Sequence, residues 1–392
     1  MKRRWTIARL APIVVVAVAT LVYNSLPAIT GVLARQLRFE PETLGAFGSA
    51  DLLGMAVGAL AAMAMMGNTS PRATGVIGLV LLLAADFGSA ISSSATALVP
   101  LRALGGVGAG LTVSACYYMY SLEDQQRNAA ASVLAQIALA FVVITAIPRL
   151  AHALGWRSVF IGLGLLVIPC LLLAREFSAG YSESKALDLS GRQAAPRVIL
   201  WLGLISSALF NVAVAAYWTY IERIGAATGI AENTISTGLS ISTAMGFLGS
   251  VVVIVFGERI HGSIIVASVI LNIVGIVVSS SPVSWVYVAA ISAYYATLPI
   301  YFSAQFAAVM RRASSSRFAA KFTLSTYVGS LGPALGGFAV SQYGVLAVRW
   351  LVVAFTVVSA VLLWVGFFSS YAGHPPAGDG LASQPKGDTV VS

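Results

Sequence analysis

The chain has 392 residues, of which 58% are hydrophobic and only 9% are charged. Soluble globular domains carry about 25% charged residues, so this composition excludes a soluble protein and leaves no room for a large soluble domain. The net charge of +9 does not indicate nucleic-acid binding, because the Lys and Arg residues are distributed over many short segments and not massed on one polar face.

In chain order, apolar stretches of about 20 residues alternate with short polar breaks. A helix needs about 20 residues to cross a hydrocarbon core of about 30 Å, so each stretch predicts one membrane span. The first stretch is too long for a signal peptide, and we expect it to be retained. The twelve expected spans are residues 10–33, 43–66, 73–92, 97–120, 128–149, 157–174, 198–221, 233–256, 263–281, 284–309, 318–341 and 346–369.

The longest interior polar segment follows the sixth span and divides the chain into two sets of six. This pattern predicts an all-α membrane protein with twelve transmembrane helices in two six-helix bundles. We expect an N-terminal bundle at residues 1–174, a central cytoplasmic linker at 175–197 and a C-terminal bundle at 198–370. The Gly, Pro and Ser-rich tail at 371–392 is expected to be disordered and cytoplasmic.

Most of the 23 Lys and Arg residues fall in segments that would share one side of the membrane with the N-terminus. Cytoplasmic loops are enriched in Lys and Arg. The distribution therefore predicts a multi-pass protein of the cytoplasmic membrane with both termini in the cytoplasm.

The fourth span contains the sequence RALGGVGAG from Arg102 to Gly110. Its glycines, Gly106 and Gly110 among them, allow helices to approach closely, which is a main source of helix association in lipid. The GPALGG sequence of the eleventh span, with Gly332, Pro333 and Gly336, offers a second packing face of this kind.

Arg102 lies inside the predicted fourth span, where burying a charge costs several kcal/mol unless it has a partner or water. Asp51 in the second span and Asp86 in the third span lie at similar depth and are the candidate partners. Two interpretations stay open at this point. The charges form a fixed ion pair that sets helix register, or they take part in proton coupling, gating or anion binding.

The six-plus-six pattern, RALGGVGAG at 102–110 and GWRSVF at 155–160 together resemble the major facilitator superfamily of secondary transporters. The resemblance covers residues 10–369 and implies transport by alternating access, with the span-four arginine linked to proton transfer. The loop after the second span departs from the family pattern. It keeps Gly67, Arg72 and Gly75 but lacks the usual acidic gate residue, and FGERIHG at 256–262 is a candidate for part of that role.

The resemblance also implies that the first, fourth, seventh and tenth spans line a central cavity. Aromatic rings with one polar group suit a small amphipathic ligand. The alternatives are an interfacial aromatic belt for the tyrosines and a helix-to-helix hydrogen bond for Gln136 in the fifth span. The candidate cavity residues are Tyr23, Asn24, Gln136, Asn211, Tyr217, Tyr294, Tyr295 and Gln305.

We therefore expect a secondary active transporter for a small organic solute, coupled to protons through Asp51 or Asp86 with Arg102 as modulator. An organic or aromatic acid is the favoured solute because Arg102 adds positive charge at membrane depth. The alternative is a proton-driven efflux pump for hydrophobic or drug-like compounds. The sequence contains no catalytic constellation and no His/Asp/Glu cluster with metal spacing, so we expect no enzyme activity, cofactor or metal. The expected partners are the solute, protons and the lipid bilayer, for a monomeric protein.

Overall fold

The computed structural model describes residues 7–65, 68–122, 125–177, 197–256, 262–312, 322 and 325–367. Most of the predicted central linker, and the whole predicted tail, lie outside these residues. The helices are α1 (Ile7–Ala19), α2 (Leu21–Asn24), α3 (Leu26–Gln36), α4 (Pro41–Met65), α5 (Pro71–Ile91), α6 (Ala95–Leu122), α7 (Gln125–Leu154), α8 (Arg157–Leu173), η1 (Ala174–Glu176), α9 (Arg197–Ala227), α10 (Glu232–Phe256), α11 (Gly262–Val278), α12 (Ser284–Arg312), η3 (Val328–Ser330), α14 (Leu331–Tyr343) and α15 (Ala347–Phe367).

Within the described ranges, nine helices are long and apolar enough to cross a membrane. The other predicted spans correspond to the broken series α1–α3, to the shorter helix α11, and to η3 followed by α14. Most helix bounds lie within a few residues of the predicted spans. The larger differences are at α7 and α9, which continue to Leu154 and Ala227, five and six residues beyond the predicted ends.

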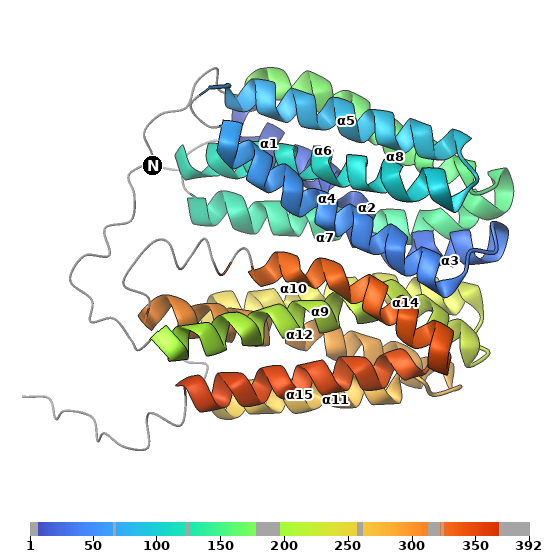
Figure 1. The fold of residues 1–392 in the computed structure, drawn as a ribbon, viewed down its shortest axis with the longest axis vertical. Helices are drawn as coiled ribbons and strands as arrows, with labels where there is room; N and C mark the ends of the chain where they lie inside the picture. The colour runs from blue at the N-terminus through green and yellow to red at the C-terminus, as the bar shows by residue number, and fades with distance from the viewer. Residues whose placement is uncertain are drawn as a thin grey trace, which may run out of the picture.

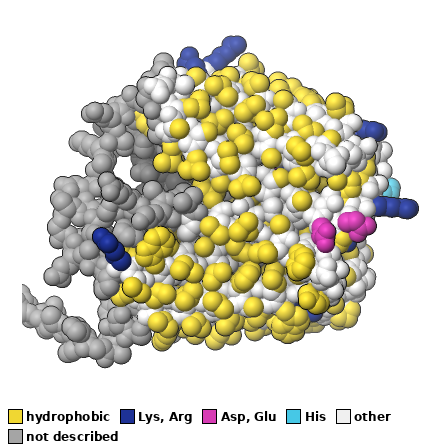
Figure 2. All heavy atoms as spheres, in the orientation of Figure 1, with side chains coloured by type: hydrophobic (Ala, Val, Ile, Leu, Met, Phe, Trp, Pro, Cys, Tyr) yellow, Lys and Arg dark blue, Asp and Glu magenta, His cyan; other side chains and the backbone are white. Residues whose placement is uncertain are grey.

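The helices form two side-by-side groups with roughly parallel axes, α1 to α8 in one and α9 to α15 in the other (Figure 1). In the first group α6 packs against both α4 and α5, and in the second α12 packs against both α10 and α11. Hydrophobic side chains cover most of the face shown in Figure 2, whereas the acidic and His side chains visible there lie at one end. A surface of this kind suits a bilayer environment.

The first predicted span is not one helix. The chain breaks its helical course at Thr20 and again at Ser25, and Pro27 lies in the first turn of α3. Proline has no backbone N–H, so Pro27 gives no hydrogen bond to the carbonyl of Tyr23, four residues earlier. The indole Nε1 of Trp218 on α9 donates to that carbonyl at 2.9 Å. The break in the first span thus exposes an acceptor that the opposite bundle uses.

Small residues set the closest helix contacts. A Cβ added at Gly106 would overlap the carbonyl oxygen of Asp51, and one at Gly110 would overlap the carbonyl oxygen of Met55. In the second bundle Gly332 packs in the same way against the backbone of α9 at Val212, and Gly336 packs against the Tyr220 ring. Glycine is required at such positions because any side chain would push the two backbones apart.

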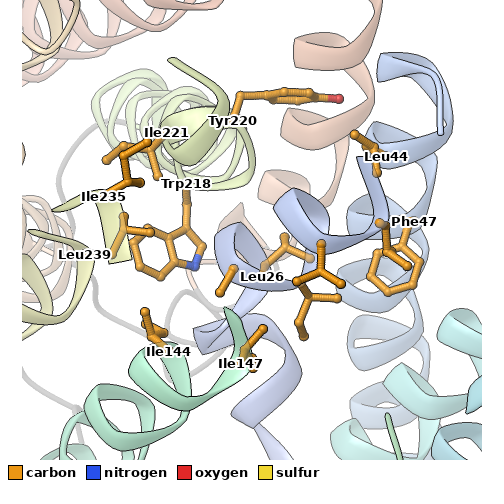
Figure 3. Close-up of a cluster of buried hydrophobic side chains, with 14 of the residues drawn as sticks. Leu26, Leu44, Phe47, Ile144, Ile147, Trp218, Tyr220, Ile221, Ile235 and Leu239 are labelled. Carbon is orange, nitrogen blue, oxygen red and sulfur yellow. The ribbon is translucent and has the colours of Figure 1, made fainter. Parts of the chain in front are cut away.

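The two bundles contact each other at the end that holds the α3–α4, α7–α8 and α9–α10 connections, which is called the closed end below (right side of Figure 1). Buried apolar side chains from both bundles meet there around Trp218, as Figure 3 shows. Pro333 of α14 packs against Gly45 and Gly48 of α4, and the backbone N–H of Ala334 donates to Ser49 Oγ at 2.9 Å. These contacts join the bundles directly.

Candidate functional site

A cavity of about 260 Å³ lies between the two bundles. Helices of both bundles line it, since α2 and α7 face α9, α10 and α12 across the space. The lining residues are Tyr23, Asn24, Val133, Gln136, Ile137, Ala140, Val214, Trp218, Thr243, Gly246, Ser250, Tyr295, Leu298 and Pro299. A ligand here would touch both halves of the protein at once.

One wall of the cavity is aromatic. The Trp218 and Tyr295 rings lie edge to face, with centroids 4.9 Å apart. Tyr294 continues this cluster behind Tyr295 at 5.3 Å, and Tyr217 lies 4.5 Å from Tyr294. Because the Trp218 N–H already donates to the backbone of Tyr23, its indole is held in place and offers the cavity a ring surface.

The wall formed by the first bundle carries two amide side chains. Asn24 Nδ2 donates to Thr20 Oγ1 at 3.1 Å, and that hydroxyl lies 2.9 Å from Gln136 Oε1. Gln136 Nε2 in turn donates to the carbonyl of Ser132 at 3.3 Å. The chain of hydrogen bonds fixes both amides, and in the bonds that the structure describes the Asn24 carbonyl oxygen and its second N–H remain available to a ligand.

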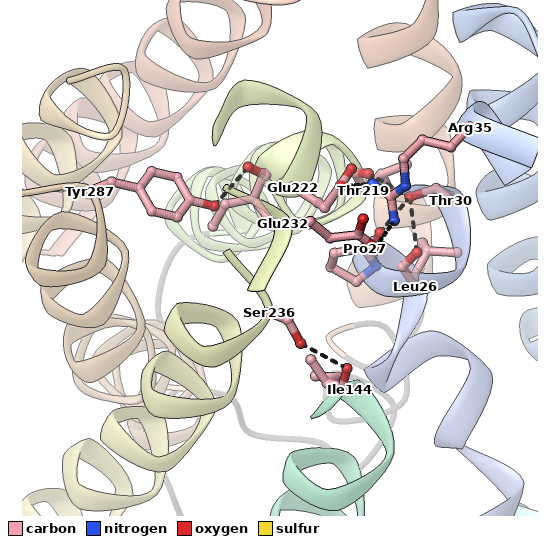
Figure 4. Close-up of polar contacts among 11 residues, drawn as sticks. Leu26, Pro27, Thr30, Arg35, Ile144, Thr219, Glu222, Glu232, Ser236 and Tyr287 are labelled. Carbon is pink, nitrogen blue, oxygen red and sulfur yellow. Dashed lines mark hydrogen bonds and ion pairs between the residues drawn. The ribbon is translucent and has the colours of Figure 1, made fainter. Parts of the chain in front are cut away.

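Polar contacts reinforce the closed end above the cavity (Figure 4). The Arg35 guanidinium on α3 pairs with Glu222 on α9, and its Nη2 lies 2.8 Å from Glu232 Oε1 at the start of α10. A Cβ at Gly31 would overlap the Glu222 carboxylate, so glycine permits this approach. Thr30 Oγ1 also donates to the carbonyl of Thr219 at 3.1 Å.

Helices α7 and α10 close the same end from another side. Ser236 Oγ donates to the carbonyl of Ile144 at 3.2 Å, and the hydroxyls of Thr145 and Ser240 lie 2.7 Å apart. From these contacts the cavity extends away from the closed end. It reaches Val133 near the start of α7 and Ser250 near the end of α10.

The three charged residues predicted for coupling lie inside the first bundle. Arg102 and Asp86 are 0% and 1% exposed, and Arg102 Nη2 lies 2.9 Å from Asp86 Oδ1. The guanidinium also lies 5.7 Å from the centre of the Phe160 ring. Asp51 is 3% exposed, and its side chain makes none of the hydrogen bonds that the structure describes. None of the three residues lines the cavity.

Four of the eight predicted cavity residues, Tyr23, Asn24, Gln136 and Tyr295, line the cavity. The rings of Tyr217 and Tyr294 lie behind its aromatic wall. Asn211 hydrogen-bonds within α9, its Nδ2 lying 2.9 Å from the carbonyl of Ser207.

Gln305 belongs to a separate buried network in the second bundle. Its Nε2 donates to Ser206 Oγ at 2.9 Å and to Ser359 Oγ at 3.0 Å, and the Tyr301 hydroxyl lies 3.0 Å from the same Ser359 oxygen. These groups tie α9, α12 and α15 together, so the amide of Gln305 is used for helix packing.

The site also contains residues that the sequence did not single out. Gly246 and Ser250 are among them and have no distinctive sequence context. Arg35 and Glu222 had a usable signal, because both are charged residues at the ends of apolar stretches. The predicted seventh span stopped at residue 221, which placed Glu222 in a loop, whereas α9 continues to Ala227.

The family model of the Major Facilitator Superfamily matches residues 13–321, which is most of the sequence. The chain belongs to the major facilitator superfamily. It is therefore a multi-pass membrane secondary transporter and not an enzyme, as the sequence predicted. A comparison with curated proteins gives no significant match. Among the residues that the structure describes, no group of three or more His, Cys, Asp or Glu side chains could hold a metal ion.

Solved structures of this superfamily share the fold at low sequence identity. The nucleoside transporter NupG superimposes with a TM-score of 0.69 at 14% identity, covering 94% of this chain and 100% of NupG. A mutant form of NupG gives a TM-score of 0.70 at 15% identity, with coverage of 92% and 98%. A D-xylose-proton symporter gives 0.67 at 16% identity, with coverage of 91% and 96%. The all-helical fold with two bundles is thus that of superfamily transporters.

Proposed function

We propose that this chain moves a small organic solute across the cytoplasmic membrane by alternating access, and that the structure represents its inward-facing state. The observation that carries the proposal is a cavity lined by both bundles and closed at one end by contacts between them. A rocking motion about such a cavity exposes it to each side in turn. In the topology predicted from the Lys and Arg distribution, the termini are cytoplasmic and the closed end faces outward.

A cross-link across the closed end tests alternating access without knowledge of the solute. Thr145→Cys and Ser240→Cys replace hydroxyls that lie 2.7 Å apart on opposite bundles. The background lacks the two native cysteines through Cys116→Ala and Cys170→Ala. Ser250→Cys in the cavity then serves as reporter, and mass spectrometry measures its labelling by a membrane-impermeant maleimide.

Before oxidation we expect labelling of position 250 from both sides of the membrane, because the cavity opens alternately. After oxidation we expect labelling from the cytoplasmic side only. Equal labelling from both sides in the cross-linked protein would rule out the proposed motion.

We further propose that the carrier is proton-coupled through the charged residues of the first bundle. Two buried carboxyls face one guanidinium, and a net charge inside a membrane protein is strongly disfavoured. Asp86 is held by Arg102, so Asp51 is the better proton carrier. Asp51 is buried within the first bundle and does not line the cavity, so its protonation acts on the packing of this bundle and not on the solute directly.

The test compares Asp51→Asn and Asp86→Asn in proteoliposomes that carry a pH gradient. We expect Asp51→Asn to abolish gradient-driven accumulation while counterflow persists, because a neutral amide cannot exchange a proton. Full accumulation by both variants would eliminate these carboxyls as carriers.

The cavity lining bears on the solute and on the direction of transport. The sequence favoured an organic or aromatic acid because of Arg102, but that guanidinium pairs with Asp86 away from the cavity lining. In the structure Arg102 therefore gives no support to an acidic solute. The apolar, aromatic lining also suits the alternative of efflux of hydrophobic compounds. A deletion strain distinguishes the two, since loss of growth on a nutrient indicates import and increased sensitivity to toxic compounds indicates export.

A further inference from the structure

We propose that the cavity selects an uncharged, planar aromatic solute that carries a hydrogen-bond donor and an acceptor on one edge. The proposal rests on the transport function proposed above and names the solute class of the same cavity. Three features of the lining carry it: the absence of charge, the aromatic wall and the polar groups at its edges.

Charge is the first feature. The cavity lining that the structure describes contains no Asp, Glu, Lys, Arg or His side chain. An ion bound there would lose its hydration without gaining a counter-charge, which is unfavourable in a low-dielectric site. The buried guanidinium of the first bundle gives no compensation, because Asp86 already neutralises Arg102. The lining therefore disfavours both anions and cations.

The aromatic wall is the second feature. Trp218 and Tyr295 form a fixed pair with ring centroids 4.9 Å apart, and Tyr23 lies in the lining of the opposite bundle. Rings held in this way stack on or meet the edge of another flat ring. A cavity of about 260 Å³ is slightly below the ~300–1,000 Å³ of pockets for drug-sized ligands. It suits a compound of one or two rings.

The polar edges are the third feature, and they depend on a second proline. Pro299 on α12 has no N–H to give to the carbonyl of Tyr295, four residues earlier, just as Pro27 has none for Tyr23. The Tyr295 carbonyl oxygen lies beside Gly246, where an added Cβ would stand 3.5 Å from it. This freed carbonyl accepts a hydrogen bond from a solute N–H.

Asn24 supplies the complementary group from the other bundle. One of its N–H groups bonds to Thr20 at 3.1 Å, which leaves the second to donate to a solute carbonyl. Amide and imide edges, which combine N–H and C=O, match this pair of acceptor and donor. Because the two partners belong to α12 and α2, such a solute would bridge the bundles.

The experiment measures ligand-induced stabilisation of the purified full chain in detergent at neutral pH. The probes are two neutral and anionic pairs of matching shape, nicotinamide with nicotinate and benzamide with benzoate, together with uracil and its carboxylated form orotate. Cyclohexanecarboxamide, which has the amide without the aromatic ring, is a further control. We expect at least one neutral aromatic probe at saturating concentration to raise the Tm by roughly 2–4 °C, while its anionic partner and the cyclohexane compound leave the Tm unchanged.

Two glycine variants show where the probe binds. Gly246→Ala adds a methyl group next to the Tyr295 carbonyl at ordinary contact distances, whereas Gly162→Ala adds one in open space on α8. We expect both variants to fold, and only Gly246→Ala to lose the ligand-induced shift in Tm. Asn24→Ala is expected to reduce the shift as well.

The inference is overturned if an anionic probe stabilises the protein as much as its neutral partner, or if cyclohexanecarboxamide matches benzamide. It is also overturned if no probe changes the Tm, or if Gly246→Ala keeps the full shift. Labelling of position 250 in the cross-linked protein uses none of these compounds, so alternating access can be correct while the solute class is wrong.

Discussion

At the scale of single residues, one guanidinium holds two carboxylates across the closed end. The Glu222 side chain is 6% exposed and that of Glu232 is 48% exposed, yet both pair with Arg35. Exposed ion pairs stabilise a state by about 0–1 kcal/mol, and breaking a fully buried pair costs about 3–5 kcal/mol. The Arg35 side chain is 37% exposed, so the pair with Glu222 lies between these limits and the pair with Glu232 lies at the exposed limit. The pair with Glu222 therefore contributes more to keeping the end closed than the pair with Glu232.

This inequality gives a matched pair of variants. We expect Glu222→Gln to increase outward opening by about tenfold or more, and Glu232→Gln by less than about fivefold. The measurement is the rate at which an impermeant maleimide labels Ser250→Cys from the outer side in the cysteine-free background. Similar rates for the two variants would contradict the assignment of Glu222 as the main partner.

At the scale of helices, glycine contacts set the separation of α4 and α6. Gly110 faces the carbonyl oxygen of Met55 so closely that an added Cβ would overlap it, whereas Gly162 on α8 has nothing within 4 Å of that position. A glycine-to-alanine change should therefore lower stability at Gly110, where the added methyl group overpacks the contact. At Gly162 it should raise stability, because it reduces the conformational entropy of the unfolded chain.

We expect Gly110→Ala to lower the free energy of unfolding by about 1–3 kcal/mol. Gly162→Ala is expected to raise it by about 0.4–1 kcal/mol. Denaturant unfolding in detergent, followed by circular dichroism, measures both. Tolerance of Gly110→Ala without loss of stability would show that α4 and α6 can separate freely.

The broken first span shows why sequence and structure differ at this scale. The apolar run predicted one first span at 10–33, but the chain forms α1, α2 and α3 with breaks at Thr20 and Ser25. Hydropathy reports only how much apolar surface a segment offers. The break depends on a proline and on an indole N–H from the opposite bundle that satisfies the Tyr23 carbonyl, and such a partner is invisible in local sequence.

At the scale of the whole molecule, the membrane orientation remains a prediction of the Lys and Arg distribution. Reporter fusions test it. We expect alkaline phosphatase to be active when inserted after Ser93 in the α5–α6 connection and inactive when fused after Ser392. The opposite pattern would place the closed end of the cavity in the cytoplasm and reverse the proposed inward-facing assignment.

The sequence by itself determined the membrane class and the all-helical fold, because lipid requires each spanning segment to be apolar and helical. The span-four motif and the six-plus-six pattern determined the superfamily. It also limited the partner of Arg102 to Asp51 or Asp86, since Arg102 has few carboxyls at its depth, and the structure pairs it with Asp86. Only the tertiary structure decided which polar residues share a cavity. Asn24, Gln136 and Tyr295 face the cavity, while Gln305 serves a packing network. That choice depends on how each helix is rotated about its axis, which close packing between helices fixes.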